Sequence, residues 1–491
     1  MFRNYLKTAW RNLIKNRTFS LLNIAGLSVG VTCSLLILLW VNYYFSFNQS
    51  IPALKNLYNV KNNQTYGADH FTFSATPFKA KDALLEGFPA VKKATRFTDI
   101  STTVAVNDKF IGQHGGYADA DFFSMFNIAI LHGAISTDPN SITGVAVSKK
   151  LAQQYFDNEE ALGKTINIDK QPATITAVYD NLPQNTQFSG TDFILPFALY
   201  YEKNKNADSW GNNVADTWVQ LQDGADLASI NKQVGQLVKK HNSASNNELF
   251  LYPLNRMTLY NRFVNGKEDP TQGQNKYVRM FTLVAFIILL IACINFMNLS
   301  TARSEKRAKE IGLRKVLGSA KADLVTRFLA ESMILSFIAV LLAIIAVLLV
   351  LPRFSNLVGI PLALDLHSPQ NIAVLLLIAV VSGLIAGSYP ALYLSSFNPI
   401  RALKKQITKT AGGSGLVRKG LVISQFAISG VMIIAVILIY QQIQYAHQRD
   451  LGFNKNNVLY IASTPDIIKS YPSLKQSLLQ NGQVSAVSLG S

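Results

Sequence analysis

The sequence predicts a multispan α-helical membrane protein with about five transmembrane helices and a large α+β domain inserted between the first and second helices. Three observations predict this fold class. Of the 491 residues, 49% are hydrophobic and only 15% are charged, and the apolar residues gather in long runs. Lysine and arginine gather in short intervals between alternate runs. One interval of about 230 residues has neither feature and is long enough to fold around its own core.

Five apolar runs are long enough to be transmembrane helices. A helix needs about 20 apolar residues to cross ~30 Å of hydrocarbon, and length separates such helices from the buried helices of a soluble core. The first run has a basic start, as a signal peptide has. It is too long for one, and no small-residue cleavage site follows it, so we expect a retained anchor. The runs are Ser20–Phe45, Arg279–Leu299, Phe328–Leu351, Ile372–Leu394 and Leu421–Gln441.

The charge distribution predicts which side of the membrane each interval faces. Residues 1–20 hold five basic residues and no acidic residue. Residues 300–328 hold eight basic and three acidic residues, and residues 396–420 hold six basic residues and no acidic residue. The large interval 46–276 is nearly neutral, with 21 basic and 22 acidic residues. Because Lys and Arg concentrate in cytoplasmic loops, we expect the three basic intervals inside and the large domain outside. The flanking apolar runs disfavour nucleic acid, the alternative partner of a basic patch.

The first half of the chain is expected to contain three elements. Residues 1–19 are predicted to form a cytoplasmic amphipathic helix, because apolar residues recur at helical spacing between basic ones. In the first transmembrane helix, 20–45, Gly26 and Gly30 have the spacing of small residues that permits close helix packing. The outer domain, 46–276, mixes strand-like and helix-like stretches. The strand-like stretches are Gly144–Ser148, Thr174–Tyr179 and Phe250–Leu254, and the helix-like ones are Lys149–Phe156 and Asp226–His241.

The second half is expected to hold the other four transmembrane helices. Residues 277–395 contain helices two to four and a charged segment at 300–324. Near the inner end of the fourth run, Pro390 should kink or end the helix. A basic cytoplasmic linker, 396–420, leads to the fifth helix at 421–441. Residues 442–491 follow it as the start of a second outer domain, so we expect one full module and the beginning of another, in a truncated or partial form.

The residues do not predict an enzyme. The sequence Gly163-Lys164-Thr165 matches the end of a phosphate-binding loop, but Asn158 stands where that loop requires glycine. The six histidines have no metal-ligand spacing, and both cysteines lie in apolar runs, so neither a metal centre nor a disulfide framework is expected. Glu331 is the main ionisable residue in a run, and its place near the inner boundary favours an interfacial role over an ion path. We expect no cofactor.

The segment 300–324 has an unusual pattern for a membrane loop. Its charges alternate in sign, and Glu305–Lys309 and Glu310–Arg314 are favourable helical pairs four residues apart. No proline interrupts residues 303–317. The pattern predicts a stiff helical elbow, and two interpretations remain open. The segment is either a docking surface for a cytoplasmic partner or an ordinary basic loop.

Several stretches resemble one family. MNLSTARSEKRAKEIGLRKVLGSAKADLVTRFLAESMIL resembles the loop between the second and third spans of MacB/FtsX-type ABC transporter permeases, most specifically at residues 310–314. WRNLIKNRTFSLLNIAGLSVGV resembles their N-terminal entry, and AGSYPALYLSSFNPIRALK the end of their fourth span. YADADFFSMFNIAILHG, VSKKLAQQYFDNEEALGKTI and AVYDNLPQNTQF resemble their periplasmic domain. NQSIPALKNLYNV, after the first span, departs from the pattern.

The resemblance implies an FtsX-like permease in the bacterial inner membrane, multi-pass, with its N-terminus cytoplasmic and a MacB-like domain in the periplasm. It implies that ATP is bound by a separate cytoplasmic ATPase subunit, and that ATP-driven motion reaches the periplasmic domain by mechanotransmission. It also implies a dimeric or pseudo-dimeric permease, contact with membrane lipids, and a periplasmic adaptor or outer-membrane partner. The docking residues it implies for the ATPase are Arg303, Arg307, Glu310, Ile311, Gly312, Arg314 and Lys315.

Two functional classes are compatible with these expectations. The first is an ABC permease subunit that exports or extracts a substrate, such as a peptide, an antibiotic or a lipid. The alternative is a membrane-anchored sensor or regulator that transmits ATPase-driven motion to a periplasmic partner such as a cell-wall enzyme. An adhesin-like domain on an anchor would leave the five spans and the patterned segment unexplained.

Overall fold

The structure is a computed structural model of the 491-residue chain. It describes residues 17–136, 138, 141–157, 160–317, 320–395, 414–449, 457–461 and 465–490, without the side chains of 303–312, 314, 393–395, 414–415, 417–418 and 465–466. The N-terminal amphipathic helix and most of the 396–420 linker therefore lie outside the described residues. The chain divides into two compact units, Met1–Leu421 and Val422–Ser491.

Within the described residues, five helices are long and apolar enough to cross a membrane, which confirms the predicted fold class. They extend past the apolar runs, since helices continue into the interfacial regions on either side of the hydrocarbon. The helix α11 continues for six residues beyond Pro352. The five helices are α2 (Arg17–Phe45), α10 (Gln274–Val316), α11 (Lys321–Val358), α12 (Pro369–Ser395) and α14 (Ser414–Gln448).

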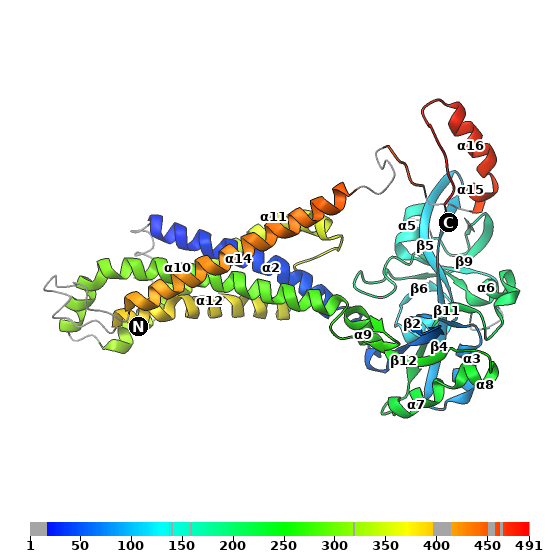
Figure 1. Ribbon diagram of the computed structural model, residues 1–491, viewed down its shortest axis with the longest axis horizontal. Coiled ribbons are helices and arrows are strands. Elements are labelled where there is room, and N and C mark those ends of the chain that lie inside the picture. The colour runs from blue at the N-terminus through cyan, green and yellow to red at the C-terminus, as the bar shows by residue number, and fades with distance from the viewer. Residues whose placement is uncertain are drawn as a thin grey trace. The chain divides into compact units, whose positions relative to one another are not determined.

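Four of these helices, α2, α10, α11 and α12, pack side by side (Figure 1). Their shared core is apolar, and small residues bring the backbones close together. Between α11 and α12, Ser336 Oγ donates to the Ala379 carbonyl at 2.8 Å, and a Cβ added at Gly387 would lie 2.7 Å from Ser332 Cβ. Polar bonds and small residues are how helices associate where lipid is as apolar as the side chains.

The outer domain is α+β, as predicted, and lies in the chain between α2 and α10. A twelve-stranded sheet has the main order β12-β1-β11-β4-β5-β10-β7-β9-β6. Its strands are β1 (Leu57–Tyr66), β2 (Asp69–Phe73), β3 (Ala75–Pro77), β4 (Val91–Val106), β5 (Lys109–Ala118), β6 (Ile130–Gly133), β7 (Val145–Ser148), β8 (Thr165–Ile168), β9 (Gln171–Tyr179), β10 (Phe193–Pro196), β11 (Asn213–Leu221) and β12 (Glu248–Pro253). A separate hairpin joins β13 (Phe263–Val264) and β14 (Lys267–Glu268).

Most neighbouring strands of the sheet are antiparallel, but β10 runs parallel to β5 and β7 runs parallel to β9. The helices of the domain are α3 (Ala80–Gly87), α4 (Asp121–Met125), α5 (Lys149–Phe156), α6 (Phe197–Lys203), α7 (Leu227–Val234), α8 (Leu237–His241) and α9 (Leu254–Tyr260), with 3-10 turns η1 (Leu54–Asn56) and η2 (Lys205–Ala207). Of these, α5 has the predicted bounds.

The prediction of one helix over Asp226–His241 is wrong. The structure has two helices, α7 and α8, with Gly235 at the end of the first. Glycine weakens a helix interior because it loses the most backbone freedom. A Cβ at Gly235 would lie 3.3 Å from the Asn231 carbonyl, so the chain is also tightly folded at the break.

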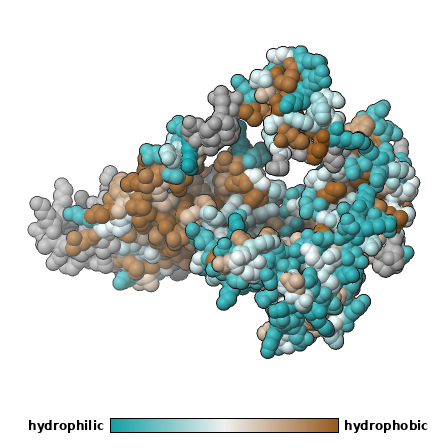
Figure 2. Space-filling model, turned by 45° about the vertical axis from the view of Figure 1, so that its right-hand side comes forward, coloured by the Kyte–Doolittle hydropathy of each residue, from teal (hydrophilic) through white to brown (hydrophobic). Residues whose placement is uncertain are grey.

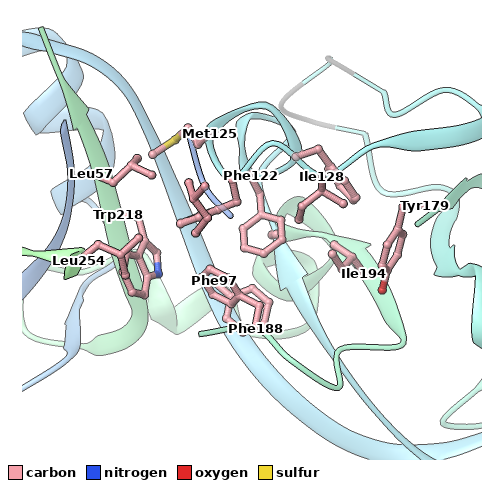
Figure 3. Close-up of a cluster of buried hydrophobic side chains, with 14 of the residues drawn as sticks. Leu57, Phe97, Phe122, Met125, Ile128, Tyr179, Phe188, Ile194, Trp218 and Leu254 are labelled. Atoms are coloured by element: carbon pink, nitrogen blue, oxygen red, sulfur yellow. The ribbon is translucent and has the colours of Figure 1, made fainter. Parts of the chain in front are cut away.

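The largest aromatic core of the domain surrounds Trp218 on β11 (Figure 3). The ring of Phe188 lies 5.4 Å from that of Trp218, 4.7 Å from Phe122 and 5.0 Å from Phe97. Edge-to-face pairs at these distances add to the stability gained by burial. The loop that carries Phe188 is thereby fixed to the centre of the sheet.

The second unit contains the part of α14 from Val422 onward, α15 (Pro465–Lys469) and α16 (Tyr471–Gln480). In the most apolar window of α14, none of the residues is buried. That residues 442–491 begin a second outer domain stays a prediction.

Candidate functional site

One helix, α10, extends from the outer domain through the bundle and beyond it. Its 43 residues form a continuous α-helix, which at 1.5 Å per residue is roughly 65 Å long, against ~30 Å of hydrocarbon. The apolar part ends at Ala302. The remaining turns to Val316 carry the charged segment, so the segment predicted to be helical continues the second transmembrane helix without a break.

The seven predicted docking residues all lie on this continuation of α10. For Arg303, Arg307, Glu310, Ile311, Gly312 and Arg314, the structure describes the helical backbone and not the side chains. Lys315 is half-buried. Beside it, Leu313, Val316 and Leu317 are exposed, Leu317 to 76%. Exposed apolar side chains next to charged ones are typical of protein-binding surfaces.

The glycines predicted to pack helices lie at the contact between α2 and α10. A Cβ built at Gly30 would lie 2.4 Å from the Ala292 Cβ, and one at Gly26 would lie 3.0 Å from Asn295 Nδ2. One turn farther out, Ser34 Oγ donates to the Ala285 carbonyl at 2.9 Å. The two helices that carry the outer domain are therefore in close backbone contact.

Pro390 lies inside α12, which continues to Ser395. The helix therefore does not end at this proline. Transmembrane helices tolerate proline because neighbouring helices and local adjustments satisfy the freed carbonyl.

At its outer end, α2 is held by the loop between β9 and β10. The Tyr43 hydroxyl donates to the Gln184 carbonyl at 3.0 Å. Asn185 Nδ2 donates to the Ser46 carbonyl at 3.0 Å. The Gln187 N–H donates to Asn48 Oδ1 at 2.9 Å. These three hydrogen bonds form the first joint between the helix bundle and the outer domain.

The second joint lies at the outer end of α10. Just before the helix, the β13–β14 hairpin is fixed to β12 and α9 because Glu268 accepts hydrogen bonds from the Tyr252 hydroxyl, at 2.7 Å, and from Arg256. Burial alone would raise the pKa of Glu268, but the hydrogen bonds from Arg256 and Tyr252 outweigh it and lower that pKa. Val278 of α10 packs against Leu259 of α9.

Aromatic residues of α2 and α10 cluster at this level. The Trp40 ring lies 4.7 Å from Tyr44 and 5.2 Å from Phe281 on the neighbouring helix. Trp and Tyr concentrate at the boundary between hydrocarbon and water. Hydrophobic residues cover the helices and hydrophilic ones predominate on the domain beyond them (Figure 2). Both joints therefore lie near one membrane surface.

The chain matches two family models that together cover both parts of this arrangement. Residues 20–237 match the MacB-like periplasmic core domain, and residues 282–399 match the FtsX-like permease C-terminal domain. The chain belongs to the MacB/FtsX-type ABC transporter permeases. The charged continuation of α10 lies within the second match.

Relatives of this permease share low sequence identity over most of the chain. The "Uncharacterized ABC transporter permease YknZ" of Bacillus subtilis (strain 168) is 24% identical over 412 residues, covering 81% of this chain and 98% of the relative. The "Macrolide export ATP-binding/permease protein MacB" of Escherichia coli (strain K12) is 21% identical over 419 residues, covering 82% of this chain. The match spans 61% of that MacB protein's length.

Two solved structures are also similar to part of the permease. A domain of a putative permease protein from Porphyromonas gingivalis covers 42% of this chain and 94% of its own, with 23% identity and a TM-score of 0.37. The periplasmic region of MacB from Actinobacillus actinomycetemcomitans covers 41% of this chain and 90% of its own, with 16% identity and a TM-score of 0.33.

The permease also contains a buried ion cluster that sequence reasoning missed. Arg96 Nη2 donates to Asp119 Oδ1 at 2.7 Å, and the guanidinium lies between the Phe78 and Phe197 rings at 4.4 and 4.5 Å. Burial would raise the pKa of Asp119, but the hydrogen bonds and charge of Arg96 lower it. A cavity of about 160 Å³ adjoins the cluster. The sequence gives no sign that Arg96 is the partner of Asp119, because the two residues lie on separate segments that only the fold brings together.

The buried residues of the permease bundle include a carboxylate and an amide side chain. Glu331 is buried in α11. Asn23 on α2 is also buried, and neither atom of its amide group has a hydrogen-bond partner. Among the described residues, no group of three or more His, Cys, Asp or Glu is placed to hold a metal.

Proposed function

We propose that this permease is the membrane subunit of an ABC transporter and transmits ATP-driven motion from the cytoplasm to its outer domain. The observation that carries the proposal is the continuity of α10. One helix bears the charged segment at its inner end and is joined at its outer end to the β13–β14 hairpin and α9. A helix of this kind moves as a stiff rod, so a push at one end displaces the other.

A separate cytoplasmic ATPase would supply the motion. It would dock on Arg303, Arg307, Glu310, Ile311, Gly312, Arg314 and Lys315, with the exposed Leu313 and Leu317 as apolar contacts. Charged residues set the orientation of such a contact, and desolvated apolar residues give it affinity. ATP would bind to that subunit and the permease itself would perform no catalysis.

The proposed location is the bacterial inner membrane, with the N-terminus in the cytoplasm and the domain between α2 and α10 in the periplasm. The excess of Lys and Arg in the three short intervals supports this orientation. The cargo would be exported or extracted at the periplasmic side. Two permease modules and a periplasmic adaptor or outer-membrane partner would complete the machine.

Only the name of a relative suggests a substrate class for this permease. The E. coli protein is named for macrolide export, so a macrolide is one substrate to test, beside peptides and lipids. Mass spectrometry of lipids and peptides that co-purify with the whole complex would identify the cargo without prior choice.

Co-purification tests the docking surface. Glu310→Lys and Arg314→Glu each reverse a charge on the proposed surface, and we expect both to abolish recovery of the ATPase with the tagged permease. Lys419→Glu is the matched control, because it reverses an exposed charge near the start of α14. Recovery of the ATPase with both variants would refute the docking assignment.

A further inference from the structure

The outer end of α2 depends on two asparagines that lie 137 positions apart in the sequence. The last carbonyls of a helix have no partner within it and must be satisfied from elsewhere. Here Asn185 Nδ2 donates to the Ser46 carbonyl at 3.0 Å and to Ser46 Oγ at 3.1 Å. A side chain of the outer domain thus caps the first transmembrane helix.

The second asparagine returns the contact. Asn48 has φ of 62°, a left-handed conformation that turns the chain sharply after the helix. Its N–H donates to the Asn185 carbonyl at 2.8 Å, and its Oδ1 accepts from the Gln187 N–H at 2.9 Å. Only 1% of Asn48 is exposed. Four hydrogen bonds therefore join residues 46–48 to residues 185–187, and the three that involve side chains are partly buried.

The loop that makes these bonds is itself fixed to the sheet. Phe188 follows directly and packs in the aromatic core with Phe97, Phe122 and Trp218 (Figure 3). Within the loop, Thr186 Oγ1 donates to the Pro183 carbonyl at 2.8 Å. A continuous path of contacts thus runs from the end of α2, through Asn185 and Phe188, to Trp218 on β11.

We infer that Asn185 is a positioning residue that makes the outer end of α2 and the periplasmic sheet move as one body. This inference rests on the proposed transmission of motion and adds the residue through which α2 takes part. Without its side chain, the joint would lose both hydrogen bonds to Ser46 and keep those of Tyr43 and Asn48, so the domain would be attached more loosely to α2 than to α10. Two rigid attachments convert a shift of the helix pair into a rotation of the whole domain.

Asn185→Asp tests the inference, because it keeps the shape and removes the donor. Asn204→Asp is the matched control. Asn204 is an exposed asparagine whose Nδ2 also donates to a backbone carbonyl, that of Tyr200, within the same domain. The full chain is placed in lipid nanodiscs with spin labels on p-acetylphenylalanine at Asn42 and Lys92, which are exposed on α2 and β4. We expect a narrow distance distribution in the parent and in N204D, and a broad one in N185D.

A cysteine pair keeps the test decisive if N185D does not fold. Asn185 Nδ2 and Ser46 Oγ are adjacent, so Ser46→Cys with Asn185→Cys replaces the hydrogen bond by a disulfide. We expect a narrow distribution when the pair is oxidised and a broad one after reduction. A distribution that stays narrow in N185D, or in the reduced pair, would overturn the inference.

A second readout separates this inference from the proposed function. In the complex with the ATPase, a purely structural role for Asn185 would leave the ATP-dependent shift in label distance intact once the protein is folded. We expect N185D to keep ATP hydrolysis and lose the shift, and the oxidised pair to restore it. If the parent shows no ATP-dependent shift in label distance, the proposed function fails. The width of the distance distribution in nanodiscs still decides whether Asn185 makes the joint rigid.

Discussion

Gly30 and Ala292 face each other so closely that a Cβ on the glycine would lie 2.4 Å from the Cβ of the alanine. This contact brings α2 and α10 together at a point where any larger side chain must push them apart. Because these two helices carry the outer domain, their separation sets how motion reaches it.

Gly30→Ile should therefore loosen the pair. Overpacking of a tight contact costs about 1–3 kcal/mol, so we expect a lower melting temperature and weaker coupling of ATP hydrolysis to outer-domain motion. Gly430→Ile on α14 is the matched control, since nothing lies within 4 Å of a Cβ there. Equal melting temperatures for the two variants would show that the α2–α10 contact tolerates the added volume.

Because of Asp119, the outer domain should lose stability as the pH falls. The pKa of Asp119 is lowered in the fold, so its contribution is fully present above the unfolded pKa of about 3.9 and is lost as pH falls through the folded value. Asp119→Asn leaves Arg96 buried without its partner, which should cost about 3–5 kcal/mol at neutral pH. Urea unfolding between pH 2 and 7 measures both effects, and a variant as stable as the parent at pH 7 would contradict the prediction.

Asp216 should act in the opposite direction. Burial raises its pKa to about 6, the nearby Lys61 charge lowers it and that of Asp99 raises it. The folded state then binds a proton more readily than the unfolded chain, so this group reduces stability as pH rises from about 4 to 6. We expect Asp216→Asn to remove that decline. The same urea unfolding series tests this prediction. It would be contradicted if the unfolding free energies of parent and variant changed in parallel between pH 4 and 6.

Reporter fusions test the orientation. A fusion after residue 150 should be active only in the periplasm and one after residue 310 only in the cytoplasm, because the basic intervals are expected inside. The opposite result at either position would reverse the proposed topology.

The sequence was sufficient for the fold class because membrane helices and their orientation depend on composition. Run length predicted the five helices, and the Gly26–Gly30 spacing indicated a tight contact, although not that α10 makes it. The continuous length of α10 was not predicted. The sequence pattern of a charged helix that follows a membrane span is the same whether the two form one helix or are separated by a break. The prediction of one helix over Asp226–His241 failed at Gly235, where α7 ends.

The joints could not be predicted, for a different reason. Asn48 and Asn185, or Arg256 and Glu268, become partners only when the sheet has brought their segments together. Nothing in their local sequence distinguishes them from the many other asparagines and charged residues of the domain. Such pairs depend on tertiary structure, as does the burial that shifts the pKa of Asp119.

The central claim is that motion enters at the inner end of α10 and leaves at the outer domain. Spin labels at Lys92 on the sheet and at Leu357, which is exposed at the outer end of α11, report movement of the domain relative to the bundle. In the complex with the ATPase, we expect ATP with vanadate to shift the distance between the labels, and Glu310→Lys to abolish the shift. A distance that does not respond to ATP in the assembled parent complex would contradict the account.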